Sequence, residues 1–441
     1  MQARSLPNGS TSRFLEGLGS FIAASPSPYH VVRSALGRLR AADFKQIDER
    51  QPWPTDPGRY VLDRDGSLIA FSTEGSVQPA VGYRIVGAHT DSPNLRIRPV
   101  PERTSVGFAQ LAVEVYGGAL LNSWLDRDLG LSGRIAVRTN SGSIESLLVE
   151  FDEPLLRVPQ LAIHLDAAIS TSGLQLNPQT HLTPVWGLDP RLRLRDFLAD
   201  KVSIDPGSIL AWELMAHDLT PPTVLGADGS MFAAPRLDNQ LSCHAAVEGL
   251  ITVCASKDPI DAVPLICLFD HEEVGSESTT GAAGSMLEVV LERISMASGL
   301  TRDEHFAALA SSLCISADGS HATHPNYVDR HEPNHLIALG AGPVLKYNES
   351  RRYASDAPGS ALVIDAARSA GVPLQQFSSR GDQRCGSTIG PVTAARLGVR
   401  TVDLGVAQLS MHSARELCGA ADPPQFTSLL SELLRAPNKA V

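Results

Sequence analysis

Long hydrophobic runs are missing from this sequence of 441 residues. A membrane-spanning helix needs about 20 consecutive apolar residues, and the longest clear run, Ala262 to Phe269, has the length of a buried strand. The apolar stretch FIAA near the N-terminus is too short for the core of a signal peptide. We therefore expect neither a membrane span nor a secretory leader.

An excess of basic residues is also missing, since the formal net charge is -11. Proteins that bind the phosphate backbone need a basic patch, so nucleic-acid binding is disfavoured. The 6 cysteines are scattered and include no Cys-x-x-Cys pair. Reduced, buried thiols are the expected state of such cysteines, which predicts a cytoplasmic location.

The first hundred residues have the pattern of an α/β protein. Apolar residues recur at helical spacing over 13–23 and 29–42, and a Gly-containing turn separates two β-rich runs over 59–73. A buried strand is predicted over 80–88, and it leads directly into His89.

The pattern changes between residues 95 and 232, where short strand-like runs alternate with turn residues; they lie at 108–118, 133–139, 143–151 and 161–165. From residue 233 onward strands alternate with helices, which predicts a mostly parallel or mixed sheet covered on both faces. The predicted organisation is an α/β/α domain in two parts, residues 1–94 and 233–441, interrupted by a β-rich domain at 95–232.

Five polar clusters fall where this interpretation places loops after strands. They contain His89, Asp238, the pair Glu272–Glu273, Asp318 and His412. Ligands of open α/β sheets gather outside the carboxyl ends of the strands. A single His-x-Asp such as His89–Asp91 is common by chance, but five clusters at these ends indicate one site.

The residue types in the clusters are those of a metal site. Two histidines and three carboxylates can bind two divalent ions if one carboxylate bridges them; the candidate ligands are His89, Asp238, Glu273, Asp318 and His412. Asp238 suits the bridge because it is short and stands at a helix start. Nitrogen and oxygen ligands without sulfur favour Zn²⁺, with Mn²⁺ or Co²⁺ as substitutes. Paired ions about 3.5–4 Å apart are a common hydrolytic arrangement.

Two further carboxylates have predicted roles beside these ligands. Asp91 stands two residues beyond His89 and could accept its second ring N–H, which would fix the tautomer. In an extended segment neighbouring side chains point in different directions, so Glu273 would face the metal while Glu272 faces a water. Glu272 would then take the proton of the water and deliver it to the leaving amine.

Read in order, the motifs GAHTDSPNLRIRP, RLDNQLSC, DHEEVGS, SADGSHATHPNY and MHSARE resemble those of the M18 metallopeptidases, the aspartyl aminopeptidase family. The resemblance extends from Ser25 to beyond the last motif. It implies the same five zinc ligands, two Zn²⁺ per subunit and Glu272 as general base. The sequence departs from the family pattern at His271 and Gly381.

The resemblance has further implications for fold, assembly and substrate. It implies a zinc-peptidase-like catalytic domain, an insertion that serves dimerisation, and dimers that assemble into a tetrahedral dodecamer. It also implies that a histidine of the insertion completes the site of the neighbouring subunit, a role that falls on His164. The implied substrates are peptides with N-terminal Asp or Glu. A cation would offset desolvation of that carboxylate; Lys346 is the first candidate, followed by Tyr353 and the adjacent arginines.

Three alternatives remain open at this point. The protein could be an aminopeptidase of broad specificity, or a deacylase or carboxypeptidase of the same two-zinc group. It could also be an assembly protein whose metals only stabilise a cage, although a purely structural site has no need for Glu272.

Overall fold

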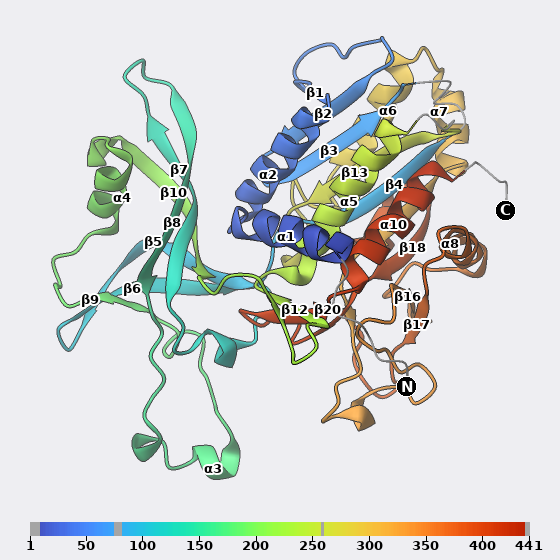
Figure 1. The fold of residues 1–441 in the computed structure, drawn as a ribbon. Coiled ribbons are helices and arrows are strands. Elements are labelled where there is room, and N and C mark those ends of the chain that lie inside the picture. The colour runs from blue at the N-terminus through green and yellow to red at the C-terminus, as the bar shows by residue number, and fades with distance from the viewer. Residues whose placement is uncertain (1–8, 75–81, 257–259, 437–441) are drawn as a thin grey trace. The chain divides into compact units, whose positions relative to one another are not determined.

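The computed structural model describes residues 9–74, 82–256 and 260–436, so Ala80 and Val81 of the predicted strand lie outside the described residues. The chain divides into two compact units (Figure 1). The first consists of Met1–Asp91, Pro222–Met411 and Glu416–Val441, and the second of Ser92–Pro221 and His412–Arg415.

A nine-stranded sheet forms the centre of the first unit. Its order is β1 (Lys45–Gln46), β2 (Arg59–Arg64), β3 (Ser67–Ser72), β13 (Val263–Phe269), β4 (Tyr83–His89), β14 (Leu313–Ala317), β18 (Arg400–Gly405), β16 (Val344–Tyr347) and β17 (Gln375–Ser378). The four central strands, β13, β4, β14 and β18, run parallel. They are flanked by the antiparallel partners β3 and β16. The prediction of an α/β fold with a mixed sheet is confirmed.

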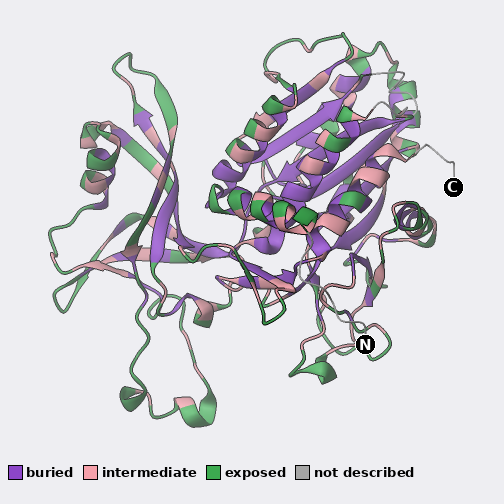
Figure 2. Ribbon diagram, viewed as in Figure 1, coloured by how far each residue is buried: buried purple, intermediate pink, exposed green. Residues whose placement is uncertain are grey.

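Helices cover both faces of this sheet (Figures 1 and 2). One face packs against α1 (Gly9–Ala23), α2 (Pro28–Ala41), α5 (Leu237–Ala255), α8 (Ala357–Ser369) and α10 (Asp422–Arg435). The other packs against α6 (Met286–Ala297), α7 (Arg302–Ala310) and α9 (Ile389–Leu397). Because both faces are covered, every residue of the central strands β4 and β13 is buried.

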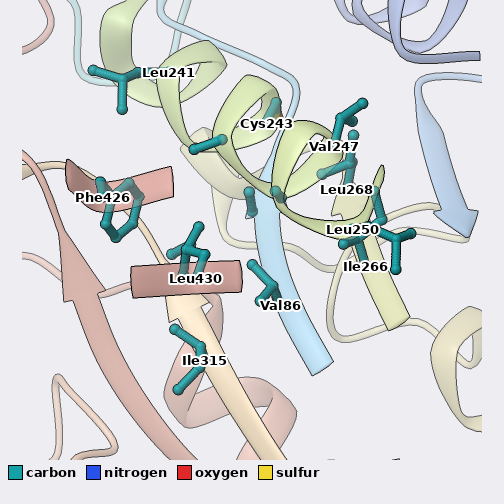
Figure 3. Close-up of a cluster of buried hydrophobic side chains, with 14 of the residues drawn as sticks. Val86, Leu241, Cys243, Val247, Leu250, Ile266, Leu268, Ile315, Phe426 and Leu430 are labelled. Atoms are coloured by element: carbon teal, nitrogen blue, oxygen red, sulfur yellow. The ribbon is translucent and has the colours of Figure 1, made fainter. Parts of the chain in front are cut away.

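The core under α5 and α10 shows how these layers interlock (Figure 3). Leu250 of α5, Ile266 of β13 and Leu430 of α10 belong to one cluster, and none of their side chains is exposed. Val86 of β4 lies in the same cluster, next to the strand end that carries His89. Burial of such side chains stabilises the fold by about 1.5–3 kcal/mol each, and it makes the strand ends rigid supports.

A smaller five-stranded sheet completes the first unit. Its order is β11 (Thr223–Leu225), β12 (Met231–Ala234), β20 (Glu416–Gly419), β19 (Ala407–Leu409) and β15 (Ser320–His321). Strand β12 leads into α5, and β19 and β20 form an antiparallel pair.

The second unit is built on a six-stranded antiparallel sheet. Its order is β8 (Ile144–Leu156), β7 (Leu129–Arg138), β10 (Ile209–Asp218), β5 (Asn94–Ser105), β6 (Phe108–Tyr116) and β9 (Val185–Gly187). Helix α4 (Leu194–Val202) packs on its core through Leu194 and Leu198. The short helices of the unit are η2 (Leu121–Trp124), η3 (Ile163–Leu165), α3 (Ile169–Ser172) and η4 (Pro206–Ser208).

The predicted strand over 161–165 is wrong. Ile163–Leu165 form the 3-10 helix η3, and its flanking residues pair with no strand in the described part of the chain. The apolar side chains of Leu161, Ile163 and Leu165 are exposed by 56%, 66% and 74%. Alternation of apolar residues requires a sheet face to bury them, and this segment has none.

None of the helices in the described ranges combines the length and apolar character that crossing a membrane requires. All six cysteines are free thiols, and all except Cys385 are buried.

Candidate metal centre

Three parallel strands bring the first candidate residues to one edge of the large sheet. His89 is the last residue of β4 and lies in register with Phe269, the last residue of β13. Asp318 follows directly on Ala317, the end of β14 on the other side of β4. The Glu272–Glu273 pair follows β13 by three residues. The parallel order therefore places imidazole and carboxylate groups at the same edge.

Asp238 reaches this edge from the start of α5. Its backbone is not helical (φ −83°, ψ 102°), its peptide bond to Asn239 is cis, and its side chain is buried. Asn239 donates a hydrogen bond of 2.8 Å from Nδ2 to the carbonyl of Ala317. The residue after Asp238 is therefore tied to the strand end that precedes Asp318, a contact that sequence analysis missed although Asn239 lies in the RLDNQLSC motif.

The candidate ligand atoms of the first unit converge. His89 Nε2 lies 3.4 Å from Asp238 Oδ1 and 3.5 Å from Asp318 Oδ1. Atoms of His89, Glu272 and Glu273 also lie within 4.8 Å of one another, as do those of Asp238 and Glu273. Four of the five predicted ligands, with Glu272 beside them, thus form one cluster.

The charges of this cluster fit a divalent cation. Burial lowers the pKa of His89, but hydrogen bonds to the carboxylates of Asp238, Asp318 and Asp91 outweigh it and raise the pKa well above its ordinary value. Burial also raises the pKa of Glu272 to about 8, with Asp318, Asp91 and Asp238 adding to the rise and His89 opposing it. Several buried carboxylates around one imidazole favour a cation, and oxygen and nitrogen donors without sulfur suit Zn²⁺.

Asp91 contacts both His89 and the Glu272–Glu273 segment. His89 Nδ1 donates to the main-chain carbonyl of Asp91 at 2.9 Å, and Asp91 Oδ1 lies 3.4 Å from the same nitrogen. Because Nδ1 faces an acceptor, it carries the proton and Nε2 is the nitrogen that can bind a metal. The Asp91 carboxylate also accepts the main-chain N–H groups of Glu272 and Glu273, each at 3.1 Å.

The expectation of an extended segment at Glu272 and Glu273 is wrong. Glu272–Val274 form the 3-10 helix η5, bounded by His271 (φ 65°) and Gly275 (φ 98°), both left-handed. The left-handed residues turn the chain sharply, and the Asp91 carboxylate holds the first two N–H groups of the turn. The tight turn, rather than strand alternation, sets the directions of the two side chains.

Lys346 contacts the main chain of Asp318, and Tyr353 lies next to Lys346. Lys346 is fully buried on β16, and its Nζ donates to the carbonyls of Asp318 at 3.1 Å and Gly319 at 3.0 Å. The same Nζ lies 4.9 Å from the ring centroid of Tyr353, whose pKa burial raises strongly. The ammonium group of Lys346 is therefore hydrogen-bonded to the main chain at Asp318, a candidate ligand.

The other two predicted site residues belong to the second unit. His412 stands three residues beyond the end of β19, has φ 67°, and donates from Nδ1 to the carbonyl of Gly118 at 3.1 Å. Because that partner is an acceptor, Nδ1 carries a proton, and Nε2 is the nitrogen available to a metal. His164 lies exposed on η3.

An α/β sheet with imidazole and carboxylate groups converging at the carboxyl ends of its strands is typical of a metallohydrolase. Residues 21–433 match the profile of a family described as "Aminopeptidase I zinc metalloprotease (M18)". The chain belongs to the M18 family of zinc aminopeptidases.

Individual relatives agree with this assignment. The "Probable M18 family aminopeptidase 2" of Streptomyces coelicolor is 48% identical over 432 residues, which cover 96% of this chain and 99% of the relative. Ape4, in a cryo-EM structure of the Ape4 and Nbr1 complex, is similar with a TM-score of 0.94 and 35% identity over 98% of this chain and 88% of that one. The S. cerevisiae mApe1 dodecamer has a TM-score of 0.84 and 29% identity, with 96% of each chain covered.

Proposed function

We propose that this aminopeptidase is a co-catalytic dinuclear zinc enzyme that releases N-terminal Asp or Glu from peptides. The observation that carries the proposal is the cluster of His89, Asp238 and Asp318 with Glu272 and Glu273 at one sheet edge. His412 is proposed as the fifth ligand and Asp238 as the bridge. These residues would hold paired Zn²⁺ ions, or Mn²⁺ or Co²⁺ in their place, which would supply Lewis-acid polarisation of a carbonyl and activation of a water.

Glu272 is proposed as the general base. It would accept a proton from the attacking water and pass it to the departing nitrogen, so that the leaving group departs as a neutral amine and not as an anion. Asp91 supports this role because its carboxylate accepts the N–H of Glu272 and of Glu273. Because Asp91 binds the main chain of both residues, it fixes the proposed base, Glu272, relative to the proposed ligand, Glu273.

Lys346 is proposed to provide the acidic preference, with Tyr353 beside it. A buried ammonium group next to Asp318 would favour a substrate that carries its own carboxylate. An aminopeptidase of broad specificity is the second candidate, since the Nζ of Lys346 already donates to two carbonyls.

We further propose that the β-rich insertion, residues 95–232, mediates dimerisation, and that dimers assemble into a dodecamer as in the S. cerevisiae mApe1 structure. Residues 1–94 and 233–441 would form the catalytic domain. His164 would complete the site of a neighbouring subunit. Three exposed apolar side chains beside it, Leu161, Ile163 and Leu165, support an interface at this segment. The cytoplasm is the proposed location.

The test is a metal-reconstituted assay on Asp-, Glu-, Leu- and Lys-para-nitroanilide, with N-acyl amino acids in parallel. We expect metal-dependent release that favours Asp and Glu. Turnover of N-acyl compounds alone would favour a deacylase, and an assembled but inactive protein with every metal would favour a structural cage. Glu272→Gln should lower kcat by about 10²–10⁴-fold. The control, Glu277→Gln, changes an exposed carboxylate of the same loop and should leave kcat unchanged.

A further inference from the structure

Glu416 is a buried carboxylate that the proposed reaction does not use. It is the first residue of β20, lies opposite Ala234 of β12, and is 2% exposed. A carboxylate removed from water is costly unless it is hydrogen-bonded. Its position at the base of the small sheet places it next to the chain that enters α5.

The contact of Glu416 is with the main chain of a candidate ligand. Its Oε2 accepts the N–H of Asp238 at 2.8 Å. The first N–H groups of a helix have no partner within the helix, and the backbone of Asp238 is not helical. A hydrogen bond to a charged acceptor is about twice as strong as a neutral one. The main chain of Asp238 therefore cannot rotate without losing this bond.

Glu416 also stands at the base of the segment that carries another candidate ligand. Strands β19 and β20 pair antiparallel, with Gln408 opposite Cys418 and Leu409 opposite Leu417. His412 lies in the connection between these two strands. Glu416, which follows this connection directly, is thus hydrogen-bonded to the start of α5.

We propose that Glu416 is a positioning residue: it holds the main chain of Asp238 so that the Asp238 carboxylate faces the metal site. This inference rests on the proposed metal ligands. It requires the acceptor oxygen of Glu416 at its present reach. Glutamine keeps that oxygen, aspartate shortens the reach by one methylene, and alanine removes the acceptor.

The test compares Glu416→Gln, Glu416→Asp and Glu416→Ala in the full chain. Zinc content is measured after dialysis against graded chelator, and thermal unfolding is followed on zinc-free protein. We expect Glu416→Ala and Glu416→Asp to bind zinc about 10–100-fold more weakly, whereas Glu416→Gln, which keeps the acceptor oxygen, should bind it more tightly than either. If Glu416→Ala does not fold, the contrast between Asp and Gln still decides the question.

Asp422→Ala is the matched control. Asp422 is also fully buried and accepts two main-chain N–H groups, those of Gly340 at 2.7 Å and Gly342 at 3.0 Å, neither of which is a candidate ligand. Its loss should lower the unfolding temperature without changing zinc affinity.

Wild-type zinc affinity in Glu416→Asp would overturn the proposal, as would equal weakening in Glu416→Gln and Glu416→Asp. A wild-type protein that binds zinc but cleaves no aminoacyl substrate would refute the proposed function and leave this test intact.

Discussion

Replacing Asp91 by alanine should impair the metal centre, although Asp91 is not itself a proposed metal ligand. The carboxylate accepts two N–H groups from η5 and lies 3.4 Å from Nδ1 of His89. Asp91 is 0% exposed, so solvent does not readily replace it. Hydrogen bonds to a charged group contribute about 1.5–3 kcal/mol each, which gives an upper limit of about 3–6 kcal/mol for the pair. Other main-chain bonds also hold η5, so part of this energy should remain.

We expect Asp91→Ala to lower kcat/KM by about 10–100-fold, the usual cost of losing a partner of a metal ligand. The assay is steady-state hydrolysis of an aminoacyl para-nitroanilide after zinc reconstitution, with zinc content measured on the same samples. Asp356→Ala is a matched control because Asp356 also accepts a main-chain N–H, that of Gly359 at 2.7 Å, at the start of α8. The reasoning would be refuted if Asp91→Ala kept wild-type kcat/KM and zinc content.

Three further substitutions test other supports. A Cβ at Gly405 would lie 1.7 Å from the carbonyl of Asp318, so Gly405→Ala should lower zinc content; normal content would contradict this. Leu250→Ala empties part of the core in Figure 3 and should cost about 2–5 kcal/mol in denaturant unfolding; a smaller loss would mean the core refills. Lys346→Met should raise KM for Asp substrates and spare Leu substrates; an equal loss on both would assign Lys346 to the Asp318 and Gly319 carbonyls instead.

The elements that carry the site could be predicted because burial leaves a strong signal in the sequence. The apolar runs of β4, β13 and β14 end at His89, Phe269 and Ala317, and polar residues follow each of them. Parallel order then brings those ends together. The same logic failed for Leu161, Ile163 and Leu165, because exposed apolar residues can have the same spacing as those of a buried strand.

The conformation at Glu272 could not be predicted for a different reason. It depends on left-handed backbone at His271 and on acceptors supplied by Asp91, which is 181 residues away in the sequence. A histidine at positive φ is uncommon, so no local rule predicts it. Helix α4 was missed although Leu194, Phe197, Leu198 and Val202 recur at helical spacing.

Two carboxylates near this site, Asp91 and Glu416, accept main-chain N–H groups from segments that carry candidate ligands. The partner of each is an amide that every residue except proline has, so neither bond leaves a trace in residue types. A count of acidic residues in the motifs therefore overestimates the number of metal ligands. Exchange for the matching amide separates the two classes, because a ligand needs its charge to bind the cation, whereas a residue that holds a main-chain N–H, as Glu416 holds that of Asp238, needs an acceptor oxygen at that position. By the same reasoning Asp91, which accepts two N–H groups on its two oxygens, should lose one of these bonds on exchange for asparagine, because an amide has only one acceptor oxygen.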